Sequence, residues 1–322
     1  MDLKTLLVPI ADDLDRTDNV IRSWLKSDVA LINEVSGYII SAGGKRLRPA
    51  TVLLCARALG ARDELPQLLA AIIEFIHTAT LLHDDVVDHS DRRRGKKTAN
   101  AVWGNSGAVL SGDFLYSRSF QMMVAAGKPS IMKVMADTTN AIAEGEVLQL
   151  LNLGDDAVTE SRYLQVIELK TARLFQAAAH LGAIASDQPD PVQQSIAAYG
   201  RHLGIAYQLV DDLLDYLADP ETSGKNLGTV LAEGKPTLPL IRAALTGTPA
   251  QSELIRQAIR DGRTEGLEEV LAAVEGTDAI PYTRALAESH RDKAIAALGD
   301  LPDSPYLSAL KGLAAFACSR LY

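Results

Sequence analysis

The chain has 322 residues, of which 47% are hydrophobic and 23% are charged, so it can bury a large core. Its 41 acidic residues exceed its 32 basic residues, which gives a net charge of −9. That balance argues against a general nucleic-acid binder, because such proteins usually carry a basic excess. The two cysteines, Cys55 and Cys318, lie far apart in apolar helical patterns, as core residues in a reducing compartment do.

We find no targeting or membrane-anchoring signal in the sequence. No uninterrupted apolar stretch approaches the ~18 residues of a membrane-spanning helix. Residues 1–4 lack the basic and apolar regions of a signal peptide, and residues 319–322 carry no lipidation signal. We therefore expect a cytoplasmic protein.

Helical periodicity dominates the chain, and strand signals are nearly absent. Connections are short and no low-complexity linker divides the chain, so we predict one all-α domain over residues 1–322, although length alone suggests about two domains. Helices from about residue 245 onward would pack around a central bundle. The predicted helices span residues 2–14, 17–41, 49–60, 65–90, 106–126, 129–152, 159–185, 190–219, 236–246, 250–261, 265–275, 281–298 and 304–319.

The first candidate site is a glycine turn followed by cations and a proline-started helix, residues 43–49. Backbone N–H groups at that helix start, with Lys45 and Arg48 beside them, would bind an anion. A basic loop in solvent explains the same composition, and on these residues alone it is the favoured interpretation.

Glu74 and His77 form a Glu-x-x-His pair on the helix that follows. One such pair fits part of a di-iron carboxylate site, but that class needs a second pair, which the sequence lacks. His77 is therefore either a hydrogen-bonded core residue or a contact to a ligand near the aspartates that follow.

The same apolar helix ends in three aspartates, Asp84, Asp85 and Asp88. Asp84 and Asp88 are four residues apart, so they share one helix face, with Asp85 beside them. Three carboxylates that close repel one another, and some take up protons unless a cation screens them.

A run of five cations within residues 91–97 follows directly. Arg93 and Arg94 belong to this run, and arginines bind phosphate oxygens with two hydrogen bonds at once. A nucleic-acid patch and a solvated charge run are alternatives, but the acidic balance and the lack of interleaved aromatics weaken the first. Cations that flank a carboxylate cluster favour a metal-bound diphosphate as the ligand.

The aspartate pattern recurs 127 positions later, at Asp211, Asp212 and Asp215, again after an apolar helical run. Two apolar helices that each end in this pattern are difficult to explain as solvated surface. If they face each other, they form an acidic site for hard cations, of which Mg²⁺ fits best because it prefers oxygen ligands.

Residues 224–236 lie just beyond the second motif and contain three glycines and two lysines, Lys225 and Lys235. That composition suits a mobile lid over an anion. An ordinary connection between two helices is an equally good interpretation.

Together these residues resemble the trans-prenyltransferases, the polyprenyl diphosphate synthase family. The resemblance runs from about residue 20 to the C-terminus. The two aspartate patterns resemble the family's two aspartate-rich motifs, and residues 43–49 resemble its diphosphate loop. Residues 74–88 and 143–150 look especially like bacterial octaprenyl diphosphate synthases.

The resemblance implies an isoprenoid synthase fold with a central cavity and a Mg²⁺-dependent reaction of an allylic diphosphate with isopentenyl diphosphate. It implies that Asp84, Asp88 and Asp211 hold the metal within the two catalytic motifs. The implied ligands of the allylic diphosphate are Lys170, Lys225 and Arg93, and those of isopentenyl diphosphate are Lys45, Arg48, His77 and Arg94. Thr171, Gln208 and Lys235 also fall at ligand-binding positions of the family.

The resemblance further places the growing product along the helix before the first motif. Ala79, beside Thr80, is small where short-chain relatives often carry an aromatic residue, and residues 65–84 offer roughly 30 Å of helical wall at 1.5 Å per residue. Met123 and Met135 would line the far end, although ordinary core packing explains them equally well. We expect a long, octaprenyl product grown from farnesyl diphosphate for quinone side chains.

Two positions depart from the family pattern. Val230 stands where an aspartate is usual, and His89 stands where close relatives tend to have an acid. These changes leave open a weakly active or regulatory subunit of a heteromeric synthase. A terpene cyclase is another alternative, but its single substrate does not require two cation sites. The resemblance also suggests a homodimer, with no nucleic-acid partner, and leaves open a peripheral membrane contact for product release.

Overall fold

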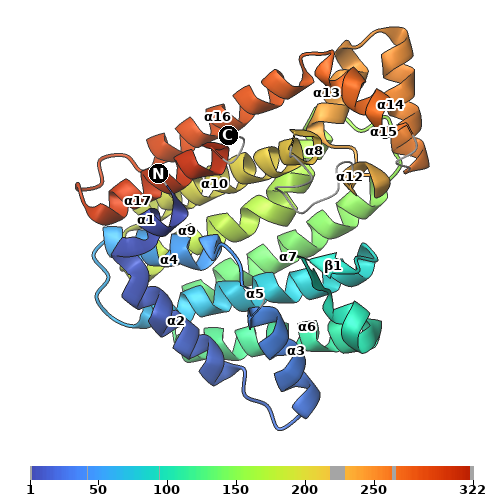
Figure 1. The fold of residues 1–322 in the computed structure, drawn as a ribbon. Helices are drawn as coiled ribbons and strands as arrows, with labels where there is room; N and C mark the ends of the chain where they lie inside the picture. Colours follow the sequence, from blue (N-terminus) through green and yellow to red (C-terminus); the bar gives the residue numbers. More distant parts are fainter. Residues whose placement is uncertain (1, 42, 94, 218–228, 263–265, 320–322) are drawn as a thin grey trace. The chain divides into compact units, whose positions relative to one another are not determined.

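The computed structural model describes residues 2–41, 43–93, 95–217, 229–262 and 266–319. Almost every described element is a helix, as predicted, and the described β structure is one pair of two-residue strands (Figure 1). By contacts the chain divides into two compact units. Unit 1 comprises Met1–Thr139, Ala177–Ala197 and Leu298–Gly312, and unit 2 comprises Asn140–Gln176, Ala198–Ala297 and Leu313–Tyr322. The single domain expected from the sequence stays a prediction.

Unit 1 holds the elements of the first third of the chain. They are α1 (Leu3–Leu7), the 3₁₀ helix η1 (Val8–Ile10), α2 (Ala11–Trp24), α3 (Ala30–Ser41), α4 (Leu47–Ala58), α5 (Leu65–Val87), β1 (Arg92–Arg93), β2 (Lys96–Lys97) and α6 (Ala99–Ala125). Four helices contribute residues to both units: α7 (Pro129–Leu151), α9 (Arg173–Ala185), α10 (Asp190–Leu217) and α17 (Pro305–Ser319).

The remaining elements belong to unit 2. They are α8 (Glu160–Ile167), the π-helical turn η2 (Glu168–Ala172), α12 (Thr229–Ala232), α13 (Leu238–Thr246), α14 (Pro249–Asp261), α15 (Leu267–Glu275) and α16 (Ala279–Ala297). Helix α13 packs against α14, α15, α16 and α8. Its buried Leu238 and Leu240 belong to two separate apolar clusters of this unit.

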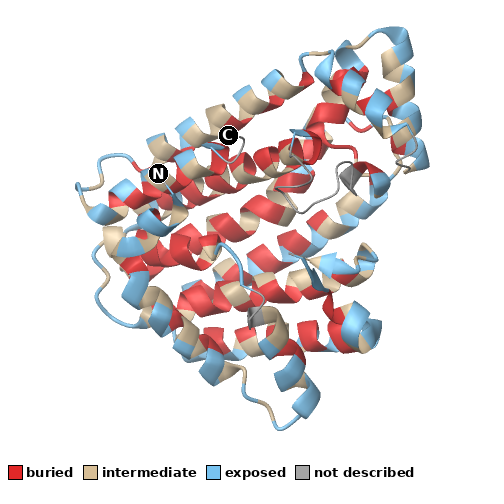
Figure 2. Ribbon diagram, in the orientation of Figure 1, coloured by how far each residue is buried: buried red, intermediate tan, exposed pale blue. Residues whose placement is uncertain are grey.

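Helix α5 is the core of unit 1. It packs most extensively on α6 and then on α4 and α2, and it is buried along most of its length (Figures 1 and 2). Of the described helices, α5 alone is long and apolar enough to cross a membrane, judged by length and composition. However, 67% of its most apolar 18-residue window is buried inside the protein, so packing accounts for its apolar character.

Several helix boundaries differ from the sequence prediction. The break expected between residues 14 and 17 lies within α2, which runs without interruption from Ala11 to Trp24. The helix expected over 17–41 is interrupted after Trp24, where the Asn33 side chain accepts from Ser27 N and donates to Ser27 O. The element α6 starts at Ala99 and joins two helices across Gly104, whose φ of 78° and ψ of 165° are not helical. The predicted start at residue 106 therefore lies close to the start of the second helix, and only the short helix before Gly104 was not predicted. After Trp24 and at Gly104, a local polar or backbone feature overrides the apolar period.

A half-buried histidine pair joins α10 to α16 in unit 2. The two Nδ1 atoms of His202 and His290 are 3.0 Å apart. Burial lowers the pKa of both rings, that of His290 to about 4, and the charges of Arg201 and Lys293 lower it further. The carboxylate of Glu168 acts in the opposite direction.

Acid should therefore destabilise unit 2 through this pair. An unfolded histidine has a pKa of 6.5 and folded His290 one of about 4, so the unfolded state binds more protons between these values. The stability contributed by His290 falls as the pH drops from about 6.5 to about 4. We expect His290→Gln to flatten this slope in urea unfolding curves recorded from pH 7 to pH 4. The same slope in both proteins would contradict the assignment.

Candidate active site

The first aspartate motif lies at the C-terminal end of α5. Asp84 and Asp88 are half-buried, whereas Asp85 is only 1% exposed. Asp88 caps the helix, and its N–H donates to Asp84 O at 2.8 Å. The C-terminal end of a helix carries a partial negative charge, so three carboxylates there are unfavourable without a nearby cation.

Arg93 of β1 supplies one such cation to the buried Asp85. Its Nε and Nη2 each lie 2.8 Å from Asp85 Oδ1. Burial raises the pKa of Asp85, whereas Arg93 lowers it. Asp85 Oδ2 is buried and has no hydrogen-bond partner. The structure thus places Arg93, which was expected at the diphosphate, against the first aspartate motif.

The β-hairpin that carries Arg93 is attached to the end of α5. Asn100 Nδ2 donates to Asp85 O at 3.2 Å and to Ser90 O at 3.1 Å, and Thr98 Oγ1 donates to Ser90 O at 2.7 Å. His89, which follows the motif, is exposed and has a positive φ of 50°. Arg94 lies outside the described residues.

The predicted anion loop lies beside an earlier part of α5. Arg48 Nη1 is 3.2 Å from His77 Nε2, so these two predicted ligands are brought together, whereas Lys45 is exposed. Arg46, which the sequence prediction did not select, adopts a left-handed conformation, and its Nη1 lies 2.9 Å from Glu74 Oε1. Arg46 thus attaches the loop to the helix that ends in the first motif.

The residues predicted to set chain length are buried in unit 1. Ala79, Met123 and Met135 are at most 1% exposed. Thr80 is half-buried, and its Oγ1 donates to His77 O at 2.8 Å. This burial fits both a tunnel wall and ordinary core packing.

The second aspartate motif lies near the C-terminal end of α10, in unit 2. Asp212 and Asp215 are each 6% exposed, and Asp211 is half-buried. Both oxygens of Asp212 accept hydrogen bonds: Oδ2 from Tyr163 OH and Oδ1 from Gln208 Nε2 at 2.8 Å. Burial raises the pKa of Asp212 to about 7, against the lowering effect of these two donors.

Lys170 and Thr171 lie on the π-helical turn η2. The sequence predicted an uninterrupted helix there, and π-helical turns occur frequently at functional sites. Lys170 Nζ donates to Glu146 Oε2 at 2.6 Å and to Gln149 Oε1 at 2.7 Å, both on α7. Thr171 Oγ1 donates at 2.9 Å to the same glutamine, Gln208, that binds Asp212.

Sequence reasoning did not select Tyr163, Glu146 or Gln149 as site residues. Their helical spacing, relative to one another and to a predicted site residue, could have identified them. Glu146 and Gln149 are three residues apart and share a helix face, and Tyr163 precedes Lys170 by seven residues, about two turns.

The predicted lid is described only in its second half. Lys225 lies outside the described residues, and Val230 lies within α12. Lys235 Nζ is 2.7 Å from Glu233 Oε2. Between them, Gly234 has a φ of 67° and accepts a hydrogen bond from Gly154 N at 2.9 Å. This bond anchors the end of the segment to the connection after α7.

The carboxylate oxygens of both motifs are suitable ligands for a divalent cation. Asp84 and Asp88 lie on one helix face, and the buried Oδ2 of Asp85 has no hydrogen-bond partner, so an oxygen of this motif fits a cation. Within the described ranges, no group of three or more His, Cys, Asp or Glu side chains is arranged to hold a metal ion. An ion would therefore need further ligands, and Mg²⁺ commonly takes them from waters and substrate phosphates.

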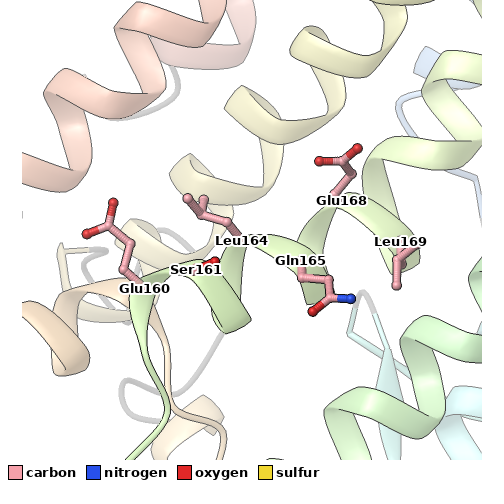
Figure 3. Close-up of a pocket in the computed structure, with 6 residues that line it drawn as sticks. All are labelled: Glu160, Ser161, Leu164, Gln165, Glu168 and Leu169. Atoms are coloured by element: carbon pink, nitrogen blue, oxygen red, sulfur yellow. The ribbon is translucent and has the colours of Figure 1, made fainter.

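A hollow of about 690 Å³ lies along the face of α8 and η2 (Figure 3). Its lining includes Glu160 and Glu168. Glu160 already accepts hydrogen bonds from Tyr282 OH, and Glu168 is paired with Arg201. Two carboxylates would repel a diphosphate, so this hollow is a poor candidate for the substrate's anionic end.

Comparison with known sequences places these motifs in a family. Residues 29–276 match the family model described as polyprenyl synthetase. The octaprenyl diphosphate synthase of Escherichia coli K12 is 51% identical over 99% of both chains. The all-trans-nonaprenyl-diphosphate synthase (geranyl-diphosphate specific) of Rhodobacter capsulatus is 44% identical over 98% of this chain and 97% of its own.

Comparison with solved structures supports the same family. A decaprenyl diphosphate synthase from Rhodobacter capsulatus superposes with a TM-score of 0.95 at 42% identity over 100% of both chains. A polyprenyl synthase from Caulobacter crescentus, complexed with calcium and isoprenyl diphosphate, gives a TM-score of 0.94 at 41% identity, covering 100% of this chain and 98% of its own. The chain belongs to the polyprenyl synthetase family.

Proposed function

We propose that the chain is a Mg²⁺-dependent trans-prenyltransferase that elongates farnesyl diphosphate with isopentenyl diphosphate to octaprenyl diphosphate, a precursor of quinone side chains. The observation that carries the proposal is the pair of aspartate motifs, each at the C-terminal end of a long helix with cations near it in sequence or in contact. The close similarity to an octaprenyl diphosphate synthase supports the substrate class and the product length.

The metal would be held by Asp84 and Asp88 of the first motif and by Asp211 of the second. Once bound, it stabilises the negative charge on the leaving diphosphate. The proposal requires both motifs to converge on the same diphosphate. Repulsion among the carboxylates supports this requirement, because a shared cation relieves it at both helix ends.

The other residues position the two substrates. Lys170 and Lys225 hold the allylic diphosphate, together with Arg93, which binds Asp85 and the diphosphate at the same time. Arg48 and His77, which are 3.2 Å apart, hold isopentenyl diphosphate with Lys45 and Arg94. The allylic C1–O bond breaks and diphosphate leaves with the electron pair. The double bond of isopentenyl diphosphate then attacks C1, and a proton is lost to the departing diphosphate. Positioning and charge stabilisation supply most of the acceleration.

Assembly and location complete the proposal. We infer a cytoplasmic homodimer of single-domain subunits, with a peripheral membrane contact for release of the apolar product. The exposed apolar residues of α6 support a subunit contact: Val102, Leu110 and Val124 are 46%, 66% and 70% exposed. Exposed apolar side chains mark a protein interface where they form a contiguous patch.

A subunit of a heteromeric synthase is the second candidate function. Val230 favours it, and so does the component 2 of a heptaprenyl diphosphate synthase from Geobacillus stearothermophilus, which is 33% identical over 100% of both chains. Incubation of the chain alone with Mg²⁺, farnesyl diphosphate and labelled isopentenyl diphosphate separates the candidates. Polyprenyl products formed by the chain alone support the first, and their absence supports the second.

Removal of a metal ligand should abolish most of the turnover. We expect Asp84→Ala and Asp211→Ala each to lower kcat by at least ~100-fold, because a preorganised charge partner contributes a few kcal/mol to the transition state. The matched control is Asp137→Ala, which removes an exposed carboxylate paired with Lys133. Near-normal turnover of either motif variant, in a folded protein, would contradict the metal assignment.

A bulky residue on α5 should shorten the product. Ala79 is fully buried, so Ala79→Tyr would block a tunnel that runs along this helix. We expect products shorter than octaprenyl on reversed-phase chromatography. Ala79→Ser, which keeps the side chain small, should retain the parent length. An unchanged length in a folded Ala79→Tyr enzyme would exclude a tunnel at this position.

A further inference from the structure

One face of α10 packs along residues 163–172, the segment that carries Lys170. Four residues of this helix at spacings of three, four and four contact that segment: Arg201, Gly204, Gln208 and Asp212. Their respective partners are Glu168, Ala172, Thr171 and Tyr163. The second aspartate motif and the lysine-bearing turn are therefore held by the same helix face.

The contact farthest from the aspartates is a two-point ion pair. Arg201 Nε donates to Glu168 Oε1 and Arg201 Nη2 to Glu168 Oε2, each at 2.7 Å. The guanidinium holds the pKa of Glu168 below its usual range. The two side chains are 37% and 32% exposed, and pairs of such exposure add little to global stability. The pair fixes the relative orientation of the two side chains, because the planar guanidinium donates to both carboxylate oxygens at once.

The turn is also confined by glycines on neighbouring helices. A Cβ on Gly204 would lie 2.6 Å from Ala172 Cα, and a Cβ on Gly145 of α7 would lie 2.7 Å from Lys170 N. Both distances are shorter than real Cβ contacts, so the two helices touch the backbone of the π-helical turn directly. Glu168 lies at the first position of this turn, at the point where the preceding α-helix ends.

The register of the turn decides where Lys170 points. A π-helical turn holds one residue more than an α-helical turn. If the turn became α-helical, residues on one side of it would rotate by about 100° relative to the other. Lys170 Nζ now lies 2.6 Å from Glu146 Oε2 and 2.7 Å from Gln149 Oε1, and such a rotation would break both hydrogen bonds.

We propose that Arg201 and Glu168 are positioning residues, which hold the π-helical turn in register so that Lys170 meets the allylic diphosphate. This inference rests on the proposed function, in which Lys170 is a diphosphate ligand. Neither Arg201 nor Glu168 touches the substrate in this account. Their effect passes through the lysine.

Binding measurements test this dependence. Farnesyl thiodiphosphate, a non-reactive substrate analogue, would be titrated with Mg²⁺ into the full chain, Arg201→Ala, Lys170→Ala and the double variant. We expect Lys170→Ala to weaken binding about 10-fold, as loss of a hydrogen bond to a charged group does, and Arg201→Ala about fivefold. The double variant should bind as Lys170→Ala does, because the pair acts only through the lysine. Effects that multiply in the double variant would overturn the proposal.

Controls separate positioning from stability. Arg242→Ala removes a comparable two-point pair with Asp278, elsewhere in unit 2, and should bind the analogue as the unchanged chain does. Arg201→Lys keeps the charge but loses the fork, so it should bind between the unchanged chain and Arg201→Ala and serves if the alanine variant fails to fold.

The same binding measurements distinguish the ligand role of Lys170 from the positioning role of Arg201 and Glu168. Unchanged binding by Lys170→Ala would overturn the ligand role of the lysine and the positioning role with it. Weakened binding by Lys170→Ala with unchanged binding by Arg201→Ala would overturn the positioning role alone.

Discussion

The repulsion of carboxylates at helix C-termini is the constraint on which the candidate site depends. Each aspartate motif places three acidic side chains within about two turns of the last described residue of its helix, and Asp88 and Asp215 lie in the last turn, where a helix C-terminus carries a partial negative charge. The aspartates of each motif differ in how far they are buried and in what binds them. At least one aspartate of each motif is buried and bound by protein groups, whereas another is only half-buried.

The two motifs solve the problem in parallel ways with different partners. The second aspartate of each motif is buried and held by protein groups: Asp85 by Arg93, and Asp212 by Tyr163 and Gln208. The first aspartate of each motif, Asp84 or Asp211, is half-buried. The half-buried positions include all three that family resemblance implies as metal ligands. Anchoring of the middle carboxylate would set the direction of the helix end, and so of the carboxylates that we propose as metal ligands.

Much of the fold could be predicted from the sequence because apolar helical periods are long and prolines, glycines and aspartates interrupt them. The break after Trp24 and the short helix before Gly104 escaped prediction, since an asparagine side chain and a non-helical glycine decide them locally. The family resemblance alone implied a shared ligand for Arg48 and His77, which lie 3.2 Å apart, and that ligand role stays a prediction. The π-helical turn at Lys170 could not be predicted from local sequence, and its close contacts with Gly145 and Gly204 come from distant segments.

The convergence of the two motifs on shared divalent ions is tested most directly by crystallography with Mn²⁺ and farnesyl thiodiphosphate. Anomalous scattering locates each manganese ion independently of the protein atoms. The account predicts ions about 2.1 Å from carboxylate oxygens of Asp84 and of Asp211, with the diphosphate bound between them. Ions at one motif only, with the other motif remote from the diphosphate, would contradict it.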